Sequence, residues 1–138
     1  MQKHTLRLEN KISELNKIRD ALEEMAATWG LPPQVSMSVN LALEEAFTNI
    51  VNYAYDDDER HEIILHFKLQ DNELHIAIRD DGRPYDPTVQ DEPDIALPAT
   101  ERPIGGLGIF LIKKIMDEVK YERADNMNQL ILKKHIVQ

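Results

Sequence analysis

The sequence predicts an α+β domain, a two-layer α/β sandwich in which three main helices cover one face of a mostly antiparallel, mixed sheet. Short segments with alternating apolar and polar residues, typical of half-buried strands, occur near the start, the middle and the end of the chain. Between them lie three longer segments in which apolar residues recur every three or four positions, as in amphipathic helices. The order of strand, two helices, hairpin, helix and hairpin favours helices gathered on one face of a sheet.

The first half of the chain is predicted to contain one strand and two helices. Residues 6–8 alternate in polarity, which indicates a short strand. From Asn10 onward apolar residues take up helical spacing, and Gly30 with the prolines after it supplies a stop. A second helix is expected to begin at Pro33, a residue suited to the first helical position, and to run to about Tyr55.

A hairpin and a long loop are predicted next. Segments 61–69 and 73–79 alternate in polarity, and Asp71-Asn72 between them suits a tight turn. Between residues 80 and 104 the periodicity is lost and five prolines occur. A loop of this length in a compact domain usually indicates either a functional loop or disorder, and we expect a lid at about 86–104.

A helix and a second hairpin are expected to complete the domain. The helix should run from Gly105 to about Glu118 and bury one apolar side. The residues on that side are Leu107, Phe110, Leu111 and Ile115. Strands near 119–123 and 129–134 follow, joined around Asp125-Asn126. A length of 138 residues suits one domain, 1–138.

Charge and composition exclude several functions. Acidic residues outnumber basic ones by 25 to 16, and a net charge of −9 would repel nucleic acid and an anionic membrane. The chain has no cysteine, which excludes a disulfide framework, a thiolate zinc site and a cysteine nucleophile. No apolar run approaches the ~20 residues that span a bilayer. We therefore expect a soluble, cytoplasmic protein.

Three polar residues of the second helix give the first chemical signal. Glu45, Asn49 and Asn52 lie at i, i+4 and i+7, so they share one stripe beside the apolar face. Asparagine inside a long helix costs helix propensity, and such conflicts are tolerated where a site needs the side chain. Taken alone, such a stripe is more typical of a solvated helix face.

Two glycine-containing segments give further signals. Gly105-Gly106-Leu107-Gly108 precedes a helix, where backbone amides can turn toward a phosphate. This segment lacks the Lys-Ser/Thr of a Walker loop and does not follow a strand as a dinucleotide fold requires. Asp80-Asp81-Gly82 stands at a strand end, which suits either a site or an ordinary turn.

In combination these segments resemble a known family, the anti-sigma-factor serine/threonine kinases of the GHKL superfamily, whose ATP-binding domain has the Bergerat fold. The resemblance covers nearly the whole chain and rests on the order and spacing of three strings. They are Glu45-Ala46-Phe47-Thr48-Asn49, then Asp80-Asp81-Gly82 with Pro84-Tyr85-Asp86-Pro87, then Gly105-Gly106-Leu107-Gly108-Ile109-Phe110-Leu111-Ile112.

The resemblance implies roles for the polar residues. Asn49 would hold Mg²⁺ through its amide oxygen, with Asn52 in the same neighbourhood. Glu45 would act as general base, orienting a seryl hydroxyl or a water toward the γ-phosphate of ATP, and the adjacent Glu44 is the competing assignment. Asp80 would accept a hydrogen bond from the adenine amino group.

The glycines and the lid complete the implied ATP site. Gly82 would let the backbone pass close to the base, and the amides of Gly105, Gly106, Leu107 and Gly108 would face the phosphates. Pro84 stands where the family usually has a glycine, which alters the expected lid geometry. Arg102 would reach the γ-phosphate or a partner protein, or remain a solvated loop charge.

The function implied is transfer of the ATP γ-phosphate to a serine or threonine of a STAS-type antagonist protein by a homodimeric regulator of a sigma factor. A second interpretation keeps ATP but drops phosphotransfer, so that nucleotide orders the lid and creates or hides a protein-binding surface. A third is the ATPase half of a histidine kinase, which the lack of a phospho-acceptor helix pair before residue 33 disfavours.

Overall fold

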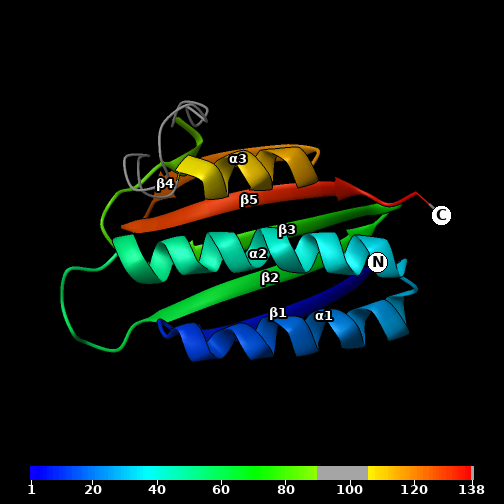
Figure 1. The fold of residues 1–138 in the computed structure, drawn as a ribbon, viewed down its shortest axis with the longest axis horizontal. Helices are drawn as coiled ribbons and strands as arrows, with labels where there is room; N and C mark the ends of the chain where they lie inside the picture. The colour runs from blue at the N-terminus through cyan, green and yellow to red at the C-terminus, as the bar shows by residue number, and fades with distance from the viewer. Residues whose placement is uncertain (90–105, 138) are drawn as a thin grey trace.

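Five antiparallel strands form the sheet in the computed structural model, which describes residues 1–89 and 106–137 (Figure 1). The strands are β1 (Gln2–Glu9), β2 (Glu62–Gln70), β3 (Glu73–Asp80), β4 (Glu118–Ala124) and β5 (Met127–His135). Their order is β1-β2-β3-β5-β4, and each neighbouring pair is antiparallel. The mostly antiparallel sheet is therefore confirmed, and the described strands include no parallel pair.

Three helices lie together on one face of this sheet (Figure 1). They are α1 (Leu15–Trp29), α2 (Pro33–Tyr53) and α3 (Gly106–Ile115), and short 3-10 turns occur at Ile12–Glu14 and Pro87–Val89. The central helix α2 packs against α1 on one side and α3 on the other. The expected two-layer sandwich is thus confirmed. None of the described helices is both long enough and apolar enough to cross a membrane.

The end of α1 and the start of α2 lie where the sequence predicts them. Gly30 ends α1 in a left-handed conformation with φ 72°, which glycine adopts without steric cost. Pro33 is the first residue of α2. The start of α1 lies at Leu15, later than the expected Asn10, because a 3-10 turn intervenes in which the Glu14 side chain accepts a hydrogen bond from the backbone N–H of Glu9.

Both hairpins close through the predicted dipeptides. Asp71 and Asn72 have φ angles of 54° and 61°, and Asp125 and Asn126 have φ angles of 54° and 62°. Positive φ at both central residues is the requirement of the type I′ turn that suits a two-residue hairpin. These turns fix the register that sends the apolar residues of each strand toward the helices.

The buried side of α3 differs from the one expected. The structure buries Gly108, Ile109 and Ile112 in this helix and Met116 just after it, whereas Phe110, Leu111 and Ile115 are only partly buried. The helix is apolar on almost every side, so periodicity could not choose the face. Packing against α2 determines the buried side, and Gly108 faces α2 so closely that a Cβ there would lie 2.9 Å from Oε2 of Glu45.

Candidate functional site

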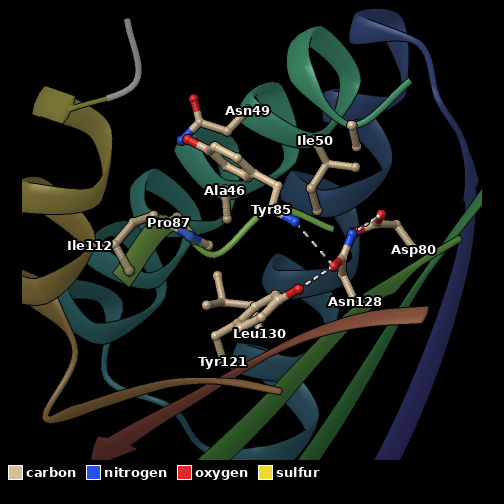
Figure 2. A pocket seen from close by; sticks show the side chains of 11 residues that line it. Ala46, Asn49, Ile50, Asp80, Tyr85, Pro87, Ile112, Tyr121, Asn128 and Leu130 are labelled. Carbon is tan, nitrogen blue, oxygen red and sulfur yellow. Dashed lines mark hydrogen bonds between the residues drawn. The ribbon is translucent and has the colours of Figure 1, made fainter. Parts of the chain in front are cut away.

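A pocket opens between α2, α3 and the ends of β3 and β5 (Figure 2). Its empty volume is about 420 Å³, which includes space open to solvent. The lining residues are Ala46, Asn49, Ile50, Ala54, Asp80, Tyr85, Pro87, Ile112, Tyr121, Asn128 and Leu130. Mostly apolar walls with a few polar groups are typical of a site for a small organic ligand.

Asp80 is the buried carboxylate of this pocket, with 3% of its surface exposed. Its Oδ1 accepts hydrogen bonds from the backbone N–H of Gly82 at 2.9 Å and from the side-chain amide of Asn128 at 3.0 Å. Burial raises the pKa of Asp80, while these two hydrogen bonds act in the opposite direction. No described residue donates to Oδ2, so this oxygen is left as an acceptor for a ligand.

Asn128, which the sequence analysis does not single out, fixes the position of Asp80. Its amide nitrogen also donates to the backbone carbonyl of Arg83 at 2.8 Å. Its Oδ1 accepts from the hydroxyl of Tyr121 and from the backbone N–H of Tyr85 at 3.4 Å. With both ends of the amide engaged, Asn128 has one orientation. The available signal was a polar residue at a core-facing position of an otherwise apolar strand.

Hydrogen bonds connect the turn after β3 to the end of α2. The backbone N–H of Arg83 donates to the carbonyl of Ala54 at 2.9 Å, and Nε of Arg83 donates to the carbonyl of Tyr53 at 2.8 Å. From β4, Nη1 of Arg123 donates to the carbonyl of Gly82 at 2.8 Å. A Cβ on Gly82 would lie only 2.5 Å from the carbonyl oxygen of Ala54. Glycine is therefore required here by packing against α2.

Gly82→Ala is expected to lower the free energy of unfolding by about 1–3 kcal/mol, because the added methyl meets backbone atoms that cannot move aside. The melting temperature should fall by roughly 5–10 °C. Thermal and urea unfolding would measure the change. Gly30→Ala is the comparison, because a Cβ there meets no atom within 4 Å and only the left-handed φ opposes it. An unchanged stability for Gly82→Ala would contradict the close packing.

Glu45 and Asn49 face the first turn of α3. A Cβ on Gly108 would lie 2.9 Å from Oε2 of Glu45 and 3.4 Å from Nδ2 of Asn49. Asn49 is buried, and its amide makes no hydrogen bond with another residue in the described part of the chain. Asn49 and Asp80 line the same pocket from opposite sides (Figure 2). The three predicted segments therefore meet in space.

The structure separates Glu45 from its neighbour Glu44. Oε1 of Glu44 accepts a hydrogen bond from the amide of Asn40, one turn earlier in α2, at 3.0 Å. Glu45 instead lies against Gly108 in the first turn of α3. Of the two carboxylates, Glu45 is the one beside the pocket residue Asn49.

Several predicted site residues do not join this group. Asn52 and Pro84 are exposed and do not line the pocket. Arg102 and Gly105 lie outside the described residues, as does most of the expected lid. Gly106 and Leu107 begin α3, and nothing is described of the Leu107 side chain. In the described residues 86–89 of the segment expected to form the lid, Asp86 accepts a hydrogen bond from the backbone N–H of Thr88 at 2.9 Å.

His61 links the loop after α2 to the turn that carries Asp80. Its Nε2 lies 2.8 Å from Oδ1 of Asp57, its Nδ1 lies 3.4 Å from Oδ1 of Asp81, and its ring stacks on Tyr55 at 4.1 Å. The hydrogen bond with Asp57 is the main reason that the pKa of His61 is raised, and Asp81 adds to the effect.

This arrangement predicts a pH-dependent contribution to stability. A raised pKa means that the folded state favours protonated His61, so the contribution is complete below the ordinary histidine pKa of about 6.5. It is lost as the pH rises through the raised value. The melting temperature of wild type should therefore exceed that of His61→Gln at pH 5.5. The difference between the two melting temperatures should be smaller at pH 8.5. A gap that widens with pH would contradict the assignment.

Comparison with known proteins agrees with this geometry. Residues 8–134 match the family model described as the histidine kinase-like ATPase domain. The chain is 28% identical over 135 residues to the serine-protein kinase RsbW of Listeria monocytogenes, covering 95% of this chain and 86% of the relative. It is 29% identical over 136 residues to RsbW of Bacillus cereus, covering 96% and 84%.

Solved structures support the fold. The RsbU and RsbW domains of a Mycobacterium tuberculosis protein superpose with a TM-score of 0.73 at 15% identity, and the match covers all of this chain and 33% of the longer one. A histidine kinase domain from Erythrobacter litoralis gives a TM-score of 0.54 at 14% identity, covering 91% of this chain and 60% of that one. The resemblance to anti-sigma-factor kinases is confirmed by the RsbW relatives, and the chain belongs to the histidine kinase-like ATPase domain family.

Proposed function

We propose that this chain is an ATP-dependent serine/threonine protein kinase that transfers the γ-phosphate of ATP to an antagonist protein. The observation that carries the proposal is that Asp80 and Asn49 line one pocket, while Glu45 lies next to Asn49 against Gly108 at the start of α3. The kinship with serine-protein kinases supports the same reaction.

The base of ATP would enter the apolar part of the pocket. Ile50, Ile112 and Leu130 offer apolar walls of the kind that a planar ring packs against. At the buried end, Oδ2 of Asp80 would accept a hydrogen bond from the adenine amino group. Guanine carries a carbonyl oxygen at the corresponding position, so two hydrogen-bond acceptors, this oxygen and Oδ2 of Asp80, would face each other. Selection of ATP over GTP follows from this opposition.

The phosphates would lie toward α3. Backbone N–H groups at the first turn of a helix attract anions, and Gly106 and Gly108 hold those positions in α3. The amide oxygen of Asn49 is the type of ligand that Mg²⁺ accepts, and no hydrogen bond within the described chain occupies it. Bound Mg²⁺ would neutralise phosphate charge. Glu45, beside Asn49, would orient the attacking hydroxyl.

The remaining parts of the proposal concern the assembly. A lid at about 86–104 would close over the nucleotide, with Arg102 and Gly105 near the phosphates and with Pro84 and Asn52 near its margins. The whole of 1–138 would act as one domain. The protein partners would be a sigma factor and a STAS-type antagonist, and the kinase would be a cytoplasmic homodimer.

The proposal is tested by calorimetry and by phosphate transfer. ATP should bind with Mg²⁺ more tightly than without it, and GTP should bind at least about 10-fold more weakly than ATP. With γ-labelled ATP, the label should appear on a serine or threonine of an antagonist protein whose gene lies next to the gene of this protein. Binding of ATP without any transfer across a panel of antagonists would favour a nucleotide-switched binding module instead.

A further inference from the structure

Hydrogen bonds between side chains of three neighbouring strands support the buried end of the pocket, where the adenine would bind (Figure 2). Asp80 ends β3, Asn128 lies in β5, and Tyr121 lies in β4, the edge strand of the described sheet. In the register of the strands Asp80 stands opposite Asn128, and Tyr121 stands opposite Leu130, two residues further along β5. Such a diagonal separation is within reach of an aromatic side chain. The Tyr121 hydroxyl therefore contacts the Asn128 amide.

The direction of each hydrogen bond in this series is determined by the groups involved. The Oδ1 of Asn128 can only accept, so the single hydroxyl proton of Tyr121 points toward it. The amide nitrogen of Asn128 can only donate, and it bonds to Oδ1 of Asp80 at 3.0 Å and to the carbonyl of Arg83 at 2.8 Å. Turning the amide over would set its oxygen against both of these acceptors. The partners of the nitrogen therefore fix the orientation of the amide, and the partners of Oδ1 fix its position.

Tyr121 is the main partner of that oxygen. The backbone N–H of Tyr85 also donates to Oδ1 of Asn128, but at 3.4 Å, beyond the range of about 2.7–3.2 Å for a normal N–H···O bond. Asn128 is buried, with 4% of its surface exposed, so water does not readily replace a lost donor. Without the Tyr121 hydroxyl, the described residues would leave Oδ1 with this one weak donor, and the amide could shift away from Asp80.

The second donor to Asp80 is held independently of Tyr121. The N–H of Gly82 donates to Oδ1 of Asp80 at 2.9 Å, and Gly82 packs closely against Ala54 of α2. Arg123 donates to the carbonyl of Gly82 at 2.8 Å. Loss of the Tyr121 hydroxyl should therefore leave the bond from Gly82 in place, while the Asp80 carboxylate gains freedom to rotate. Rotation would move Oδ2 away from the place proposed for the adenine amino group.

We infer that Tyr121 is a positioning residue for adenine recognition. Its hydroxyl holds the Asn128 amide, and the amide holds the Asp80 carboxylate in the rotation that presents Oδ2 to the base. The inference rests on the proposed ATP site and assigns part of its selectivity to a residue of the edge strand. Tyr121 acts through Asn128, so its removal should loosen adenine recognition without altering the phosphate end of the pocket.

The test compares Tyr121→Phe with wild type by calorimetric titration. ATP with Mg²⁺ should bind about 3- to 10-fold more weakly to the variant, the range for the loss of one uncharged hydrogen bond. The affinity for GTP should stay within about 2-fold of wild type, because GTP lacks the amino group that Asp80 would recognise. The matched control is Tyr53→Phe, which removes the same hydroxyl from the last residue of α2, outside the pocket. This control should bind ATP as wild type does.

Two further measurements separate positioning from a general structural role. In an Asp80→Asn background, Tyr121→Phe should cause no further loss of ATP affinity, because the acceptor that it positions is already absent. In the transfer assay, Tyr121→Phe should raise the KM for ATP and leave kcat within about 2-fold of wild type, because Glu45 and Asn49 are unchanged. A general loosening of the domain would lower kcat as well.

Three results would overturn the inference. The first is ATP binding by Tyr121→Phe that equals that of Tyr53→Phe, and the second is an equal loss of affinity for ATP and GTP. The third is a full additional loss in the Asp80→Asn background, which would indicate that the Tyr121 hydroxyl contacts the nucleotide itself. Each of these leaves the proposed function standing if wild type binds ATP. Absence of ATP binding by wild type would contradict the proposed function and this inference together.

Discussion

Glu45→Gln is expected to slow phosphate transfer by about 100-fold or more, the scale of a lost general base. The substitution keeps the size and the hydrogen-bonding reach of the side chain beside Gly108, where Oε2 of Glu45 now lies. What it removes is the ability to take a proton from the attacking hydroxyl. ATP affinity should therefore change little. Single-turnover transfer of γ-labelled phosphate to the antagonist would measure the rate.

The neighbouring glutamate supplies the control. Glu44→Gln alters a side chain that accepts a hydrogen bond from Asn40, one turn earlier in α2. The rate of phosphate transfer should therefore stay within about 2-fold of wild type. If the two variants were slowed equally, or if Glu45→Gln transferred phosphate as fast as wild type, the proton would be removed by another group.

Asp80→Asn is expected to weaken ATP binding by about 10- to 100-fold, the range for losing a hydrogen bond to a charged group. An asparagine can keep the two internal bonds, since its oxygen can still accept from Gly82 and Asn128. Its nitrogen then replaces Oδ2, so a donor faces the adenine amino group. The fold should survive while the base loses its partner. Calorimetric titration with ATP would measure the change.

Asp81→Asn is the matched substitution for this experiment. The Asp81 side chain is about half exposed and lies near His61, outside the pocket. The dissociation constant for ATP should therefore be close to that of wild type. Equal affinities for wild type and Asp80→Asn would remove Asp80 from adenine recognition, whatever the transfer assay shows.

The secondary structure was largely readable from the sequence because its signals are local. Gly30, Pro33 and the two Asp-Asn turns act through the φ angles of their own residues, so each marks a boundary without reference to the rest of the fold. The face of α3 was not readable, because an almost wholly apolar helix has no preferred side. Contact with α2 decides it.

The site was readable only in part for the same reason. Asn49, Asp80 and Gly108 could be proposed from their strings, and the structure brings them together. Asn128 acts through residues 43 and 48 positions away in the chain, and no local pattern reports such a contact. The packing of Gly82 against Ala54 is likewise visible only in three dimensions.

The Asn128 amide joins two structures that a ligand would meet in succession. One end holds the carboxylate at the pocket's inner end, and the other is bonded to the backbone of Tyr85, where the chain leaves β3 for residue 86 and beyond. A base that draws Asp80 toward itself would pull on this amide and so on the backbone at Tyr85. Occupancy of the pocket and the backbone position of Tyr85 would then depend on each other, and substitutions at position 128 would alter both together.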